Sequence, residues 1–107
     1  MYNAKQYADR FADRLNDFVE ENGLSLMEDS GEFTENAISE FTTQNLERAH
    51  SLVSDELDDM FIVSEDDREG NYLVTTLIDD SEIEHALIEY NHEEAQFGLP
   101  YQAVIFD

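Results

Sequence analysis

Cysteine and tryptophan are absent from this chain of 107 residues, which also holds a single lysine and a single proline. Without cysteine, a disulfide framework, a thiol nucleophile and a thiolate zinc site are all excluded. The sequence also lacks the roughly 18 consecutive apolar residues of a membrane span and the apolar segment of a signal peptide. We therefore expect a protein of the cytoplasm that makes no contact with a membrane.

Catalytic signatures are missing as well, since there is no Gly-rich phosphate loop, nucleophile elbow or HExxH motif. With so many acids in the chain, some pair of carboxylates will lie at acid–base distance in any fold, so paired acids do not indicate catalysis. We expect a protein that is not an enzyme and that carries no cofactor.

Two segments have spacings that are compatible with a metal site. His85, Glu89 and His92 would share one face of a helix, but the sequence offers no clear fourth ligand. Acids alternate over residues 65–70 as in an EF-hand loop, but Thr76 stands where a bidentate glutamate is required. The simpler interpretation is that the histidines pack or face solvent, and we expect no metal.

Acidic residues are what the sequence has in excess, with 27 Asp and Glu against 5 Lys and Arg and a formal net charge of −22. A small domain stays soluble with a net charge of about 2 to 8 in magnitude. The remaining charge opposes folding by self-repulsion and attracts basic surfaces, most of which belong to proteins that bind nucleic acid. Because 41% of the residues are hydrophobic, the chain should still fold, as one acidic domain over residues 1–107.

Apolar periodicity predicts an α+β domain of three helices packed on a small, mainly antiparallel three-stranded sheet, in the order α-α-β-β-α-β. Asn3 is placed to cap a first helix that runs to about residue 22. The apolar stripe of this helix consists of Tyr7, Phe11, Leu15, Phe18 and Val19. The later elements are a helix over 34–60, strands over 61–64 and 72–78, a helix over 82–96 and a strand over 101–106. The β-branched pair Thr42-Thr43 could divide the second helix in two.

The third helix has an alternative. It is predicted from the helix-start cluster at 79–81, whose serine has capping-box spacing to Glu84, and from apolar residues at helical intervals after it. However, the alternation of Ala86, Ile88 and Tyr90 would also suit a strand.

All three predicted helices end in acids, although the C-terminal end of a helix is negative and favours cations. The pairs are Glu20-Glu21, Asp58-Asp59 and Glu93-Glu94. An acid at such an end costs roughly 0.3 to 1 kcal/mol. Residues that oppose folding where they stand often belong to a functional site. The acids at the three predicted helix ends therefore indicate that the negative charge has a function.

The segment 54–70, SDELDDMFIVSEDDREG, places acids on both sides of a short apolar strand. A rigid strand would hold the acids before and after it at fixed separations, as an imitation of regularly spaced phosphates requires. Tyr72, Tyr90 and Tyr101 could add aromatic anchors to such a surface. The residues that we expect to bind a partner are Asp55, Glu56, Asp58, Asp59, Glu65, Asp66, Asp67, Glu69, Asp79, Asp80, Glu82 and Glu84.

In composition, size and lack of motifs, the chain resembles the acidic proteins of phages and mobile elements that block restriction enzymes, CRISPR complexes or DNA-repair enzymes. The resemblance implies an inhibitor that imitates nucleic acid and occupies the basic DNA- or RNA-binding groove of a host protein. Its place of action would be the cytoplasm of the host cell if a phage encodes it. Such a protein would bind no nucleic acid itself, and a homodimer is left open.

Three other interpretations stay open. An immunity or antitoxin protein that neutralises a basic nuclease toxin would use the same charge, with aromatic anchors around the toxin's active site. A regulatory or adaptor module could bind a basic protein without imitating DNA. A high-salt origin would also explain many acids and little lysine, but such chains tend to keep fewer large apolar side chains than the 7 Phe and 10 Leu of this one.

Overall fold

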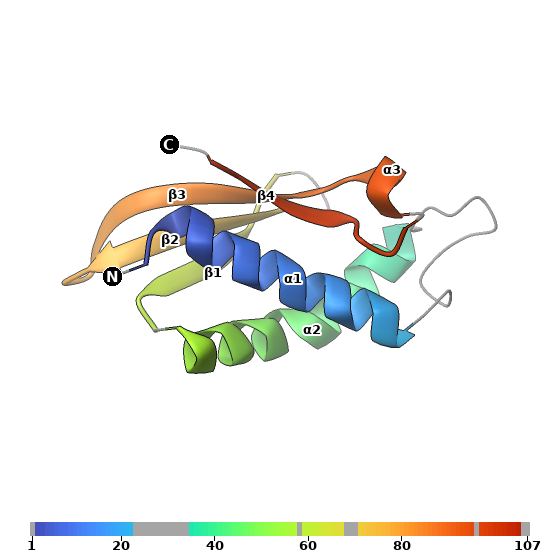
Figure 1. Ribbon diagram of the computed structural model, residues 1–107, viewed down its shortest axis with the longest axis horizontal. Helices are drawn as coiled ribbons and strands as arrows, with labels where there is room; N and C mark the ends of the chain where they lie inside the picture. Colours follow the sequence, from blue (N-terminus) through green and yellow to red (C-terminus); the bar gives the residue numbers. More distant parts are fainter. Residues whose placement is uncertain (1, 23–34, 58, 68–70, 96, 106–107) are drawn as a thin grey trace.

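Two long helices and a four-stranded sheet make up the part of the chain that the computed structural model describes, residues 2–22, 35–57, 59–67, 71–95 and 97–105 (Figure 1). The elements are α1 (Ala4–Asn22), α2 (Glu35–Glu56), β1 (Phe61–Glu65), β2 (Tyr72–Ile78), β3 (Ser81–Tyr90), the one-turn helix α3 (His92–Ala95) and β4 (Tyr101–Ile105). The strands lie in the order β1-β2-β3-β4, each antiparallel to its neighbour. Both long helices lie on the same side of the sheet (Figure 1). The α+β class is therefore as expected.

Helix α1 begins as the sequence predicts, because Asn3 caps it. The Asn3 Oδ1 atom accepts a hydrogen bond from the Gln6 N–H at 2.8 Å, and the Gln6 Oε1 atom accepts one from the Asn3 N–H at 2.9 Å. This reciprocal pair satisfies two backbone donors at the helix start. The predicted apolar stripe of α1 is confirmed, since its five side chains are at most 2% exposed: Tyr7, Phe11, Leu15, Phe18 and Val19.

Helix α2 packs beside α1 and reaches both edges of the sheet through aromatic contacts. Near its start, Phe41 stacks on Tyr101 of β4 with ring centroids 5.8 Å apart. Further along, His50 stacks on Phe61 of β1 at 4.5 Å. These contacts place α2 on the face of the sheet that α1 also covers.

The predicted division of the second helix is wrong, because α2 continues through Thr42 and Thr43. Packing on one side explains the continuity, since Phe41, Ala49 and Val53 are all buried along a single face. The helix ends at Glu56, earlier than the predicted end near residue 60.

The predicted third helix over 82–96 is also wrong. Residues 81–90 form strand β3, so the fold has two long helices and four strands instead of three helices and three strands. Ala86 and Ile88 are 1% and 0% exposed, whereas the residues that flank them are only partly buried. Burial with a period of two belongs to a strand that is covered on one face. Of residues 82–95, the described part of the predicted helix, 92–95 are helical.

Asp79 and Asp80 form a tight turn between β2 and β3 instead of starting a helix. Ile78 pairs with Ser81 across the turn, and both aspartates have positive φ, 50° and 66°. Two positive φ values in a two-residue loop characterise the type I′ turn, whose twist matches that of a hairpin. The predicted capping box between Ser81 and Glu84 therefore does not form.

Candidate protein-interaction surface

The predicted partner-binding acids lie at two opposite ends of the sheet. Phe61 at the start of β1 pairs with Thr76 near the end of β2, and the Leu77 N–H donates to the Met60 carbonyl oxygen at 2.9 Å. The last turn of α2 and the β2–β3 turn therefore share one end, which we call the turn end. Its acids are Asp55, Glu56, Asp59, Asp79, Asp80, Glu82 and Glu84.

The opposite end of β1, which we call the loop end, carries Glu65, Asp66 and Asp67. The Asp66 N–H donates to the Asn71 carbonyl oxygen at 3.0 Å, and the Asn71 Oδ1 atom accepts a hydrogen bond from the Tyr90 N–H at 2.9 Å. Asn71 thereby holds the loop end against β3. Two further predicted site residues, Asp58 and Glu69, lie outside the described residues.

At the turn end, β2 and β3 extend beyond their neighbours as a two-stranded ribbon. Over the described residues, strand β1 pairs with β2 as far as Thr76, and β4 pairs with β3 from Ala86 onward. Ile83 is an extra residue in the ribbon, because Leu77 pairs with Glu82 and Thr76 with Glu84. Every residue from 78 to 84 is exposed, so the four acids of the ribbon are fully available to a partner.

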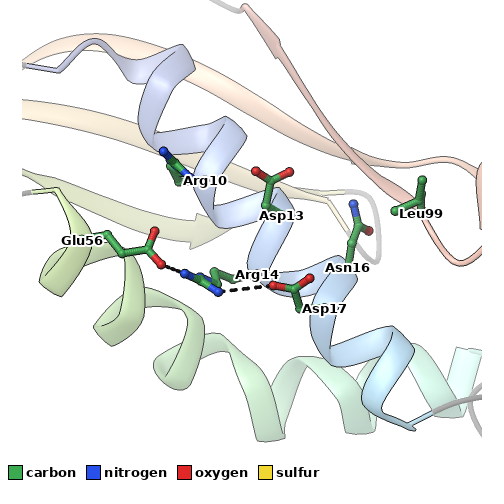
Figure 2. A pocket seen from close by; sticks show the side chains of 7 residues that line it. All are labelled: Arg10, Asp13, Arg14, Asn16, Asp17, Glu56 and Leu99. Carbon is green, nitrogen blue, oxygen red and sulfur yellow. Dashed lines mark hydrogen bonds and ion pairs between the residues drawn. The ribbon is translucent and has the colours of Figure 1, made fainter.

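The acids at the helix ends are in a different position, because arginines from the neighbouring helix compensate two of them. Arg14 of α1 forms an ion pair with Glu56 in the last turn of α2, and it also contacts Asp17 at 3.3 Å (Figure 2). Conversely, Arg48 of α2 forms an ion pair with Glu21 in the last turn of α1, with 3.1 Å between the Arg48 Nη1 and Glu21 Oε2 atoms. Neither helix has a basic residue of its own in its last turn. Each helix therefore supplies an arginine that compensates an acid at the end of the other helix. Glu56 thus contributes to the contact between α1 and α2 and is less available to a partner.

The third acidic helix end of the prediction is wrong. Glu93 and Glu94 lie in the first turn of α3, where the helix dipole favours acids. The Asn91 Oδ1 atom accepts hydrogen bonds from both of their backbone N–H groups, at 2.9 and 3.2 Å, and caps the helix. These two acids are therefore normal helix-start residues.

Asp59, between α2 and β1, is held close to the last turns of the helix. The Ser54 hydroxyl donates to the Asp59 Oδ1 atom at 3.2 Å and lies 3.4 Å from the His50 Nδ1 atom. The His50 Nε2 atom is 3.4 Å from the Phe61 carbonyl oxygen. This polar chain connects α2 to β1 and fixes the carboxylate at the turn end.

The described cations are confined to the helix layer of the fold, whereas acids occur in both layers. The described cations are Lys5, Arg10, Arg14 and Arg48, and all of them are on α1 and α2. Among residues 59–67, 71–95 and 97–105 there is no lysine or arginine, and these residues hold eleven acids: Asp59, Glu65, Asp66, Asp67, Asp79, Asp80, Glu82, Glu84, Glu89, Glu93 and Glu94. The sheet layer is therefore uniformly negative over the residues described.

A shallow groove of about 280 Å³ runs along α1 and is drawn in Figure 2. It is lined by Arg10, Asp13, Arg14, Asn16, Asp17, Glu56 and Leu99. Partial burial raises the pKa of the Asp13 carboxyl, an effect that Arg10 opposes and the neighbouring Asp9 and Asp17 reinforce. Since most of the groove's charged groups pair with one another, we interpret it as a structural ion-pair network.

The tyrosines that were expected as anchors belong mainly to the core. Tyr72 and Tyr101 are 1% and 3% exposed, and their rings are 6.1 Å apart. Burial, with the adjacent Tyr72 hydroxyl as a second cause, raises the pKa of Tyr101 far above its usual value. Tyr90 is partly buried and meets the Tyr101 ring edge-on at 5.9 Å. Tyr72 and Tyr101 are therefore not available as aromatic anchors at the surface.

The metal-compatible spacing of His85 and Glu89 was derived for a helix and is lost, because both residues are on strand β3. Among the residues described, no group of three or more His, Asp and Glu side chains could hold a metal ion. Nor is any helix in the described ranges long and apolar enough to cross a membrane.

No family model, curated protein or solved structure matches this chain.

Proposed function

We propose that the protein is a non-catalytic inhibitor that imitates nucleic acid and occupies the basic DNA- or RNA-binding groove of a host protein. The proposed targets are restriction enzymes, CRISPR complexes or DNA-repair enzymes. The observation that carries the proposal is the exposed acidic ribbon at the turn end, together with the lack of lysine and arginine among the described residues of the sheet layer. None of the ribbon acids forms an ion pair with a described cation, so a basic partner could engage all of them.

The spacing of the two acidic ends also suits a phosphate array. Strand β1 has five residues, and at about 3.3 Å per residue it separates the acids just before it from those just after it by roughly 17 Å. Phosphates follow one strand of duplex DNA at about 3.4 Å of axis each, so this distance spans about five of them. The ribbon acids lie beyond the start of β1 and are therefore farther from the loop end. Secondary structure fixes both ends, and fixed carboxylates bind a basic groove without the entropy that a flexible acidic tail would lose.

The same charge opposes direct binding to nucleic acid, because the protein and the phosphate backbone are both anionic. The proposed partner is therefore a basic protein, and the proposed place of action is the cytoplasm of the cell that contains it. A homodimer is not required by this mechanism.

A capture experiment tests the proposal. The chain is immobilised as bait in a cell extract, and bound proteins are eluted at rising salt. A ribbon variant, Asp79→Asn, Asp80→Asn, Glu82→Gln and Glu84→Gln, is compared with a control of equal charge change at exposed acids of the two helices, Asp9→Asn, Asp17→Asn, Glu20→Gln and Glu47→Gln. Nucleic-acid-binding proteins should be captured by the original chain and the control and be lost with the ribbon variant. Equal capture by both variants, or capture of no such protein, would refute the proposal.

A second candidate is an immunity or antitoxin protein that neutralises a basic nuclease toxin. It is favoured by Ile78 and Ile83, which are 42% and 49% exposed among the ribbon acids. Apolar side chains within a charged surface are typical of a specific protein interface. This function predicts tight binding to one nuclease that persists at high salt, whereas groove imitation predicts binding that weakens steeply as salt rises.

A further inference from the structure

The face of the sheet that points away from the helices carries aliphatic side chains. Side chains alternate along a strand, so the neighbours of the buried Phe61, Val74 and Ala86 point to the opposite side. We call this side the outer face. No described helix covers it (Figure 1).

An aliphatic row crosses three strands of the outer face. Leu73 pairs with Leu87, and Leu87 pairs with Val104, so the three side chains are direct cross-strand neighbours. Ile62 of β1 lies on the same face and pairs with Thr75. Ile62 and Val104 are 45% and 40% exposed, and the two leucines are partly exposed.

This composition is unusual for a solvated sheet face. Antiparallel sheets that are covered on one side normally present polar residues on the other. The chain contains 27 acids, and yet aliphatic residues occupy this row, beside the polar His85, Glu89 and Gln102 on the same face. Contiguous exposed apolar surface in an otherwise highly charged protein marks a site of interaction.

The charges around the outer face define the chemistry of its partner. The turn end lies at one end of the strands and the loop end at the other, so acids flank the aliphatic row on two sides. No lysine or arginine is present among the described residues of the sheet layer. A second copy of the chain would bring like charges together at both ends, whereas a partner with basic residues at matching positions would neutralise them.

We propose that the outer face docks a protein whose contact surface has an apolar strip between two clusters of lysine and arginine. The inference rests on the proposed function for the basic character of the partner. It adds that binding requires the aliphatic row as well as the acids, so that apolar contact gives an affinity that charge alone does not.

The test uses two synthetic peptides of equal positive charge, at physiological salt. One is an amphipathic helix of leucine and lysine, which presents an apolar strip between lysines, and the other is oligolysine. Backbone amide NMR shifts of the full chain are recorded during each titration. The leucine–lysine peptide should shift the amides of Leu73, Leu87 and Val104 together with those of the ribbon. Oligolysine should shift the acidic ends alone.

A variant pair makes the test specific for the outer face. Ile62→Thr with Val104→Thr keeps β-branched residues on both strands and should weaken binding of the leucine–lysine peptide by about tenfold. The control, Phe97→Ser with Leu99→Ser, removes two side chains that are 71% and 56% exposed in the segment before β4 and should leave binding unchanged. Oligolysine should bind all three proteins alike.

Three results would overturn the inference: equal binding of the leucine–lysine peptide to the outer-face variant, identical shift maps for the two peptides, and concentration-dependent outer-face shifts without peptide. The last result would identify a second copy of the chain as the occupant. Since nucleic-acid-binding proteins are captured in a separate experiment, any of these results can arise while the proposed function stands.

Discussion

Asn16 shows how one side chain can fasten a strand to a helix. It is 8% exposed on α1, and its amide bonds to both backbone groups of Tyr101 at the start of β4. The Asn16 Nδ2 group donates to the Tyr101 carbonyl oxygen, and the Asn16 Oδ1 atom accepts from the Tyr101 N–H, each at 3.0 Å. The amide thus acts as a strand partner for β4, which is an edge strand of the described sheet.

Asn16→Ala should therefore lower the free energy of unfolding by about 2 to 4 kcal/mol, because it leaves two buried backbone groups without a partner. Urea denaturation followed by circular dichroism measures the change. Gln102→Ala, at an exposed position one residue further along, is the control and should change stability by less than about 0.5 kcal/mol. A similar small effect for Asn16→Ala would show that the two hydrogen bonds do not hold β4.

Asp13 predicts a dependence of stability on pH. Burial raises the pKa of its carboxyl in the folded state, so ionisation of Asp13 opposes folding. The stabilising effect of the proton is complete below the usual aspartate pKa of about 3.9 and is lost as pH rises through the raised value. Asp13→Asn should therefore stabilise the protein at pH 7, and the difference from the original chain should vanish as pH falls below about 4.

Urea midpoints measured from about pH 3 to pH 7 check this prediction. Asp9→Asn is the matched control on the same helix, because Asp9 forms an ion pair with Lys5 at 2.6 Å. It should give a smaller gain or a loss at pH 7. Equal gains from both substitutions would mean that general repulsion, and not the burial of Asp13, controls the effect.

At the scale of elements, the β2–β3 hairpin differs most from what its sequence predicts. Helical periodicity in Ile83, Ala86, Leu87 and Tyr90 arises because apolar residues near a bulge can match the periods of both a helix and a strand. The first helix was predictable because its stripe of aromatic and aliphatic residues continues over about three turns and because an asparagine caps its start. Local sequence could not show whether residues 81–90 form a helix or a strand, because pairing with β2 and β4 determines their conformation.

The same limit applies to the candidate surface. The acidic segments themselves were predictable, since each is continuous in the sequence. That the α2 end and the β2–β3 turn share one end of the sheet depends on the register of β1 with β2. The compensation of Glu21 and Glu56 depends on how α1 packs against α2. Long-range packing therefore decides which acids are exposed without an ion pair, as in the ribbon, and which form ion pairs between the helices. The sequence alone does not show this difference.

The β2–β3 turn is strained by its two aspartates and can be improved. The type I′ turn favours Asn-Gly, so Asp79→Asn with Asp80→Gly should raise the free energy of unfolding by about 0.5 to 1 kcal/mol. Asp79→Asn with Asp80→Asn removes the same charge without glycine's freedom at positive φ and should give a smaller gain. Urea denaturation in 1 M salt, where charge effects are screened, isolates the conformational part. A loss of stability with the Asn-Gly pair would contradict the turn.

At the scale of the whole molecule, charge and fold oppose each other. A net charge of −22 destabilises the compact state, and exposed ion pairs such as Arg48–Glu21 contribute little against it. The core of two helices on one sheet face must therefore supply nearly all of the stability. The acids persist, in our interpretation, because a basic partner neutralises them.

Salt should accordingly stabilise the protein without being required for folding. Raising sodium chloride from about 0.1 M to 1 M shortens the screening length from about 10 Å to 3 Å, so the thermal midpoint should increase steadily. The transition should stay cooperative at the lowest salt, because the buried core is intact there. Unfolding at low salt would instead favour a high-salt origin for the acidic composition.

Competition with nucleic acid tests the central proposal most directly. A nucleic-acid-binding protein recovered with the chain as bait is mixed with labelled duplex DNA or RNA, and the chain is then titrated into the complex. Imitation of nucleic acid predicts that the chain displaces the labelled duplex completely and that the ribbon variant, Asp79→Asn, Asp80→Asn, Glu82→Gln and Glu84→Gln, does so much more weakly. Simultaneous binding of the chain and the duplex to the same protein would contradict it.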